Sequence, residues 1–173
     1  MKNFTLVNKF AKKRQCVFFG STQFAQTEFT EILENSCSEK IYNRSVEKLD
    51  MQNVSEFMNI CAVDLEPSKL FINIGEEDIK NSDFNLENFI SKYEWLLYQF
   101  HKKCSDCTLY VVPVISDDEK VRDVNRALEK LSLETGCIFV KLNEMTFSNL
   151  VKALKLYLRD FPISFADAMQ YAG

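Results

Sequence analysis

Two groups of reactive side chains stand out in this sequence, because each directly follows an apolar run. Hydroxyls occur at Ser21 and Thr22, after the run at residues 17–20, and three carboxylates occur at residues 76–78, after another apolar run. A serine or threonine hydroxyl can attack a carbonyl carbon when a neighbouring base takes its proton. A carboxylate serves as that base if burial raises its pKa. The pattern therefore allows acyl transfer, with Thr22 or Ser21 as nucleophile and a carboxylate such as Glu77 as base.

The same residues also have ordinary structural uses. Ser21 or Thr22 would cap the first helix, and acids that follow a strand are favoured at helix N-termini. A second acidic group at residues 117–119 follows a later apolar run, so the two groups could meet and share a divalent cation. His101, Cys104 and Cys107 have ligand-like spacing, but a structural zinc site normally needs a fourth ligand. We expect neither a metal nor a cofactor.

Composition indicates an ordinary folded protein. The chain has 173 residues, 46% of them hydrophobic, with 15 Phe and only 4 Gly and 3 Pro. Its net charge of -4 argues against a nucleic-acid partner. The exception is a basic N-terminal segment, residues 1–14, which is either a solvated edge or a contact for a membrane surface or anionic partner. With no signal-peptide pattern and no apolar run near the ~18 residues of a membrane span, we expect one cytoplasmic domain over residues 1–173. Its six cysteines should be reduced.

Short β-like runs alternate with longer helical ones. The predicted strands are 15–19, 40–42, 69–74, 108–114 and 137–141, and the predicted helices are 22–35, 51–63, 85–103, 119–135 and 146–158. This alternation implies right-handed crossovers and a parallel sheet with helices on both faces. We therefore predict a three-layer α/β/α sandwich with a five-stranded parallel sheet in the flavodoxin-like order 2-1-3-4-5. Ligands of such sheets bind beyond the carboxyl ends of the strands.

Local signals mark both ends of the fourth predicted helix. Ser116 and Glu119 have the spacing of a capping box at its start, and Gly136 supplies a left-handed stop after it. The C-terminal segment, residues 145–173, is predicted to contain an amphipathic helix and then a short apolar helix at residues 161–169. That apolar part either packs over the sheet or forms an interface.

The segments at the expected carboxyl edge resemble the SGNH, or GDSL-type, hydrolase family. Gly20-Ser21-Thr22 stands where that family carries Gly-Asp-Ser, and Asn43-Arg44-Ser45 stands where it carries Asn-Arg-Gly. The segment Gly75-Glu76-Glu77-Asp78 stands where the family carries Gly-x-Asn-Asp. The resemblance extends from about Gln15 to Leu142 and implies the family's fold. It also implies a ligand-binding cleft formed by Gly20, Ser21, Thr22, Asn43, Arg44, Ser45, Gly75, Glu76, Glu77 and Asp78.

The same resemblance implies that the family's reaction is lost. Thr22 falls at the nucleophilic serine, and Ser45 falls at the oxyanion-hole glycine. Glu77 falls at the oxyanion-hole asparagine, where a carboxylate has no N–H to donate and repels a developing negative charge. No Asp-x-x-His motif occurs near the C-terminus, and the only histidine, His101, is predicted near the end of the third helix.

From these residues we predict an SGNH-hydrolase-like protein that has lost ester hydrolysis and serves as a ligand-binding or protein-interaction module. The alternative is an active acyl ester hydrolase or acyltransferase, with Thr22 or Ser21 as nucleophile and a carboxylate base. A third interpretation is a partner subunit that forms oligomers through the C-terminal helix.

Overall fold

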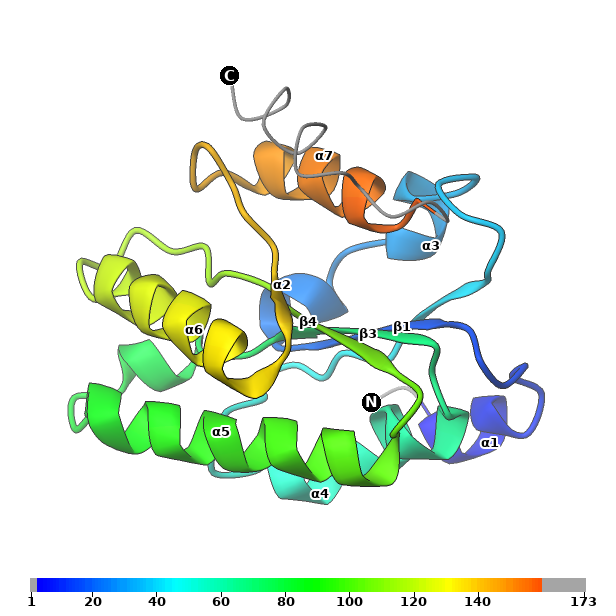
Figure 1. Cartoon of the computed structure of the whole chain (residues 1–173), viewed down its shortest axis with the longest axis horizontal. Helices are drawn as coiled ribbons and strands as arrows, with labels where there is room; N and C mark the ends of the chain where they lie inside the picture. The colour runs from blue at the N-terminus through cyan, green and yellow to red at the C-terminus, as the bar shows by residue number, and fades with distance from the viewer. Residues whose placement is uncertain (1–2, 160–173) are drawn as a thin grey trace.

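Five short strands form one parallel sheet in the computed structural model, which describes residues 3–159 (Figure 1). In chain order they are β1 (Cys16–Gly20), β2 (Ile41–Asn43), β3 (Lys69–Asn73), β4 (Thr108–Val111) and β5 (Ile138–Phe139). Their order in the sheet is β2-β1-β3-β4-β5, and all neighbouring pairs are parallel. The predicted fold class and strand order are confirmed. The strand order reverses at β1, so the loops after β1, β2 and β3 meet at one edge of the sheet.

Helices cover both faces of the sheet, as Figure 1 shows. One face packs against α1 (Phe4–Asn8), α4 (Val54–Cys61), α5 (Leu86–Lys103) and α6 (Val121–Thr135), together with the short 3-10 turns η1 (Val63–Leu65) and η2 (Asp78–Lys80). The other face packs against α2 (Thr22–Ala25), α3 (Phe29–Ile32) and α7 (Phe147–Tyr157). The strands between these layers are nearly continuous in apolar residues because both of their faces are buried.

A row of aromatic rings crosses the face covered by α3 and α7. Phe18 of β1 stacks on Phe71 of β3 at 4.8 Å between ring centroids, and Phe71 stacks on Tyr110 of β4 at 4.3 Å. Phe29 of α3 extends the row, with its ring 4.6 Å from that of Phe18. Stacked pairs of this kind stabilise by about 0.5–1.5 kcal/mol beyond the area that they bury.

The predicted glycine stop is confirmed, and α5 and α7 each bury one apolar face. One face of α5 is buried, with Phe89, Tyr93, Leu96, Leu97 and Phe100, whereas Trp95 and Tyr98 are exposed. In α7, Leu150 and Leu154 are buried in the same way. Gly136 ends α6 in the left-handed region, at φ +71°.

Two local predictions were wrong. The helix predicted over residues 22–35 is two separate turns, α2 and α3, because the Asn43 side chain takes the carbonyls between them. Asn43 Nδ2 donates to Phe24 O at 2.8 Å and to Thr27 O at 3.0 Å. The capping box at Ser116 does not form either, since α6 begins only at Val121 and Ser116 Oγ accepts from the nearby Asp118 N–H at 3.1 Å.

The two ends of the chain agree with prediction only in part. The basic N-terminal segment contains α1, a helix that was not predicted, whose Phe4 is buried in the core. The predicted C-terminal helix is present as α7, whereas the apolar segment predicted at 161–169 lies outside the described residues. Across residues 3–159, no helix is both long enough and apolar enough to cross a membrane.

Candidate functional site

The site expected at the carboxyl edge is built on two close backbone approaches. A Cβ added to Gly20 at the end of β1 would lie only 2.8 Å from the carbonyl oxygen of Asn73 on β3. Gly75 follows β3 at φ +137°, a conformation that residues with a side chain rarely adopt, and a Cβ there would meet Val114 at 2.8 Å. Gly20 thus lets the end of β1 lie against β3, and Gly75 lets the loop after β3 lie against Val114 and Phe89.

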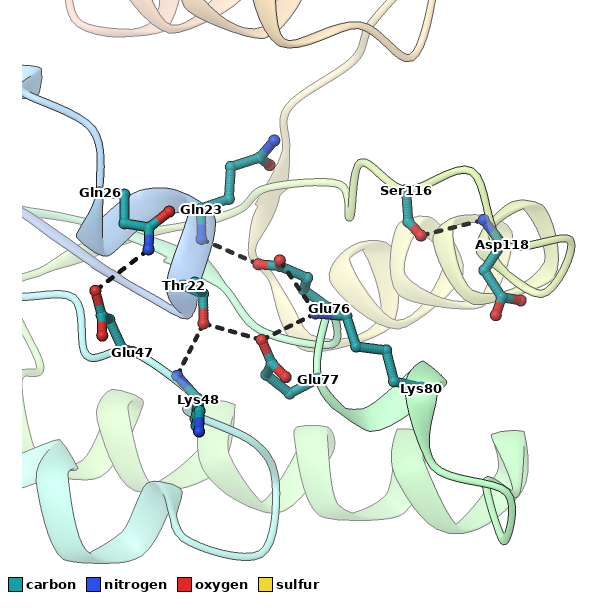
Figure 2. A network of polar contacts seen from close by, with 10 residues as sticks. All are labelled: Thr22, Gln23, Gln26, Glu47, Lys48, Glu76, Glu77, Lys80, Ser116 and Asp118. Atoms are coloured by element: carbon teal, nitrogen blue, oxygen red, sulfur yellow. Dashed lines mark hydrogen bonds and ion pairs between the residues drawn. The ribbon is translucent and has the colours of Figure 1, made fainter.

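Thr22 and Glu77 are brought together by this arrangement, as Figure 2 shows. The Thr22 hydroxyl donates to Glu77 Oε1 at 2.9 Å, and Thr22 Oγ1 accepts from the backbone N–H of Lys48 at 2.9 Å. Lys48 lies in the loop after β2 and reaches this position with a left-handed backbone, at φ +58°. The hydroxyl at the nucleophile position is therefore hydrogen-bonded as both donor and acceptor.

Two carboxylates and one lysine complete the polar network. Lys80 Nζ forms ion pairs with Glu77 Oε1 at 3.1 Å and with Glu76 Oε1 at 3.5 Å. Glu76 Oε2 also accepts from the Gln23 backbone N–H at 3.0 Å, at the N-terminal end of α2. Both carboxylates are about four-fifths buried, since 20% and 21% of their side-chain surface is exposed. Glu76 thus satisfies an amide at the start of α2.

Ser21 does not cap α2 through its side chain. It is the N-cap residue by position, but its Oγ makes no capping bond. That oxygen is buried and has no hydrogen-bond partner among the described residues. The predicted capping by Ser21 or Thr22 is therefore wrong, and Glu76 from a distant loop takes the role. As a fully buried side chain, Ser21 is also poorly placed to meet a substrate.

Ser45 stands where the resemblance expects an oxyanion-hole glycine. Its Oγ accepts from the Gly20 backbone N–H at 2.9 Å, which ties the loop after β2 to the end of β1. Its own backbone N–H donates to Asn43 Oδ1 at 3.1 Å. The N–H that would stabilise an oxyanion already has a partner within the same loop.

The other two expected cleft residues lie away from Thr22. Arg44 extends toward α1, where its Nε donates to Asn8 Oδ1 at 2.9 Å. Asp78 turns inward, and its Oδ1 accepts from the Met51 N–H at 3.0 Å. Burial raises the pKa of Asp78 from 3.8 to about 6, and the nearby charge of Asp50 adds to the rise.

The metal hypotheses gain no support from the geometry. Within residues 3–159, no three His, Cys, Asp or Glu side chains come together as a metal-binding group. Asp118 pairs with Lys120 at 3.4 Å. The His101 Nε2 lies 2.9 Å from Thr135 O, beside Cys137 rather than Cys104.

The position of His101 also excludes it from the site. Thr135 ends α6, and β5 starts three residues later, so His101 lies at the amino ends of the strands. Thr22 lies at their carboxyl ends. The only histidine of the chain is thus on the opposite edge of the sheet from the nucleophile position.

Sequence reasoning missed two members of the network. Lys80 lies three residues after Glu77 and four after Glu76, a spacing that could have indicated an ion pair on one helical turn. Lys48 contributes only its backbone N–H, so its residue type carried no signal.

Solved structures share this fold. It is the fold of the SGNH, or GDSL-type, hydrolases, which confirms the predicted resemblance at the level of the fold. The chain matches a candidate platelet activating factor from Streptococcus pneumonia with a TM-score of 0.75 and 16% identity, covering 90% of this chain and 89% of that one. It matches a GDSL-like lipase from Bacteroides thetaiotaomicron with a TM-score of 0.65 and 13% identity, over 80% and 77% of the two chains.

A third structure is a lipase/acylhydrolase from Enterococcus faecalis, with a TM-score of 0.63, 12% identity and coverage of 83% and 80%. At these identities the likeness concerns the fold alone. No family model and no curated protein matches the sequence.

Proposed function

We propose that this chain is an SGNH-fold protein that does not hydrolyse esters and acts by binding a ligand or a protein partner. The observation that carries the proposal is the internal pairing of the groups that hydrolysis would need. The Thr22 hydroxyl is bonded to Glu77 and Lys48, and the Ser45 N–H is bonded to Asn43. A nucleophile can be bonded to its base, but its oxygen and the oxyanion-hole N–H must be open to a substrate. Here Thr22 Oγ1 already accepts from the Lys48 N–H, and the Ser45 N–H already donates to Asn43.

Electrostatics oppose the reaction as well. A tetrahedral intermediate on Thr22 would develop its negative charge beside two carboxylates, Glu76 and Glu77. Removing a single oxyanion donor costs about 3–4 kcal/mol in other acyl-transfer sites. Here a donor is replaced by a negative charge, and no imidazole lies near to move the proton. The combined barrier leaves little room for catalysis.

Ester hydrolysis is the direct test. The protein is incubated with p-nitrophenyl acetate and p-nitrophenyl butyrate, beside the Thr22→Val variant, which keeps the side-chain shape and removes the hydroxyl. We expect both proteins to give only the buffer rate and neither to be labelled by a fluorophosphonate probe. Turnover by the wild-type protein that disappears in Thr22→Val would refute the proposal.

One observation favours the alternative, an acyl ester hydrolase with altered residues. The 2.9 Å bond from Thr22 Oγ1 to Glu77 Oε1 is within the reach that a nucleophile and its base require. Against it, Lys80 contacts the same oxygen at 3.1 Å. In this version Glu77→Gln would abolish any activity as completely as Thr22→Val does, and the fluorophosphonate would attach at Thr22.

The setting of the proposed function follows from the sequence. We keep the prediction of a cytoplasmic location, where the six cysteines would stay reduced. If the chain binds a protein partner, we propose that it associates as a subunit through α7. Sedimentation at increasing protein concentration tests it, because a monomer at every concentration would leave small-ligand binding as the function.

A further inference from the structure

A cavity of about 700 Å³ opens at the free edge of β2. It lies between α1 and α3, which cover opposite faces of the sheet. Its apolar walls include Phe4, Phe29, Leu33 and Ile41, all of them buried. The volume is within the range of small-molecule sites, roughly 300–1,000 Å³. None of Thr22, Ser45 or Glu77 lines it, so it is separate from the polar network described above.

Arg44 supplies the one strongly buried charge in the cavity wall. Only 8% of its surface is exposed, and its guanidinium carbon lies 5.4 Å from the centre of the Phe4 ring and 5.1 Å from that of Tyr42. Rings placed in this way attract a cation and hold the guanidinium plane in a fixed orientation. Desolvation by burial lowers the pKa of the Arg44 guanidinium, so the charge is held here at a cost.

No carboxylate compensates this charge. Within residues 3–159, no Asp or Glu forms an ion pair with Arg44. Its Nε donates to Asn8 Oδ1 at 2.9 Å, and its Nη1 makes a long bond of 3.4 Å to the carbonyl of Asn43. A guanidinium has five N–H donors, so most of them are left for another acceptor. A buried cation without an anion is costly, and an anion that enters the cavity would remove that cost.

We propose that this cavity binds a monocarboxylate with an apolar body, its carboxylate held by Arg44 and its body held by the apolar walls between α1 and α3. The planar fork of a guanidinium matches the two oxygens of a carboxylate. This inference assigns a site and a ligand class to the binding function proposed above. It rests on that proposal only because it takes the chain to be a binding protein.

The rim of the cavity argues for a single negative charge. Glu28 and Glu34 lie at its exposed margin, where they repel polyanions such as nucleotides, and Lys40 offsets them only in part. Glu39, also in the wall, is occupied by Lys69 at 3.2 Å. A ligand with one carboxylate beside Arg44 and an uncharged remainder meets the least repulsion.

Isothermal titration with octanoate tests the proposal, with 1-octanol and acetate as probes that lack the charge or the apolar body. We expect octanoate to bind about tenfold or more tightly than either. The Arg44→Met variant should lose the preference for octanoate over octanol. In Thr30→Trp, the exposed Thr30 at the cavity wall becomes a large side chain that fills the space without touching the charge, and octanoate binding should fall about tenfold. Leu133→Trp, at a position 79% exposed on α6 and outside the cavity wall, is the matched control and should bind octanoate like the wild type.

Equal affinity for octanoate and 1-octanol would overturn the proposal, as would undiminished octanoate binding in Thr30→Trp. If Arg44→Met does not fold, the comparison of the two probes and the Thr30→Trp variant still decide the matter. Failure here is distinguishable from failure of the proposed function, because ester turnover depends on Thr22 and octanoate binding does not.

Discussion

The buried carboxyl group of Asp78 should make the stability of this protein fall as pH rises from acid to neutral. One of its oxygens accepts from the Met51 N–H, and the other is buried without a hydrogen-bond partner among the described residues. Desolvation raises the pKa of Asp78 in the folded protein from 3.8 to about 6, against the lowering effect of Lys92. The folded state therefore holds this proton more tightly than the unfolded chain does.

The sign and size of the effect follow from that difference in pKa. Below about pH 3 the carboxyl group is largely neutral in both states and costs the fold little. Between pH 4 and pH 7 it ionises first in the unfolded chain, so the free energy of unfolding falls by about 2 kcal/mol on account of this group. Above the folded-state pKa of about 6 the full penalty, roughly 3 kcal/mol, has been reached.

Urea unfolding at several pH values between 4 and 8 measures the effect, with wild type and Asp78→Asn compared at each. The asparagine keeps an oxygen for Met51 but buries an N–H₂ group, so its stability at any single pH is offset by an unpaired donor. The informative quantity is the change with pH. Relative to wild type, Asp78→Asn should gain about 2 kcal/mol between pH 4 and pH 7. Asp83→Asn, at an exposed position, is the control and should follow the wild-type profile. Parallel profiles for wild type and Asp78→Asn would refute the reasoning.

Three further substitutions, two of them paired with a control substitution, test other parts of the structure by chemical unfolding. Gly20→Ala should lower the free energy of unfolding by about 1–3 kcal/mol, because the added Cβ meets a backbone carbonyl of β3 at 2.8 Å. In the control Gly136→Ala, the added Cβ meets nothing within 4 Å, so only backbone strain of about 1 kcal/mol is expected. Equal losses would contradict the close approach. Phe71→Leu should lower the free energy of unfolding by about 1–2 kcal/mol, because it removes ring stacking and buried apolar surface. Phe10→Leu, at a site that is 84% exposed, should leave stability unchanged. Thr22→Val should lower the free energy of unfolding by about 1–3 kcal/mol, since it leaves the Lys48 N–H without an acceptor and Glu77 with only its ion pair to Lys80. An unchanged midpoint would mean that the network adds no stability.

The sheet could be predicted from the sequence because its signals are local. Apolar runs followed by glycine or polar residues placed all five strands, and the alternation with helices predicted that they are parallel. Their order was chosen as the flavodoxin-like one, and the structure confirms it. The strand at 108–114 was predicted too long, since pairing stops at Val111 while the chain stays apolar and buried to Val114. Burial alone does not distinguish a paired residue from an unpaired one.

The details of the site depended on contacts between distant segments, which no local pattern carries. The break between α2 and α3 comes from Asn43, about 17 residues further along the chain. The start of α2 is satisfied by Glu76, which is 53 residues away. The resemblance placed Thr22 and Glu77 in one region, and the two side chains are hydrogen-bonded there, but only the structure brings in the Lys48 amide that completes the network.

The aromatic row across the sheet has a consequence for how the chain finds its fold. Phe18, Phe71 and Tyr110 come from three strands that are far apart in sequence, yet they face each other directly in the strand register. A slip of one residue in β1 would turn Phe18 to the opposite face and replace it with Val17 or Phe19. A shifted register therefore loses two ring stacks at once, whereas the backbone hydrogen bonds could still form in it. The row therefore stabilises the correct strand register over shifted ones. Because it joins segments that are distant in sequence, it can be completed only late in folding.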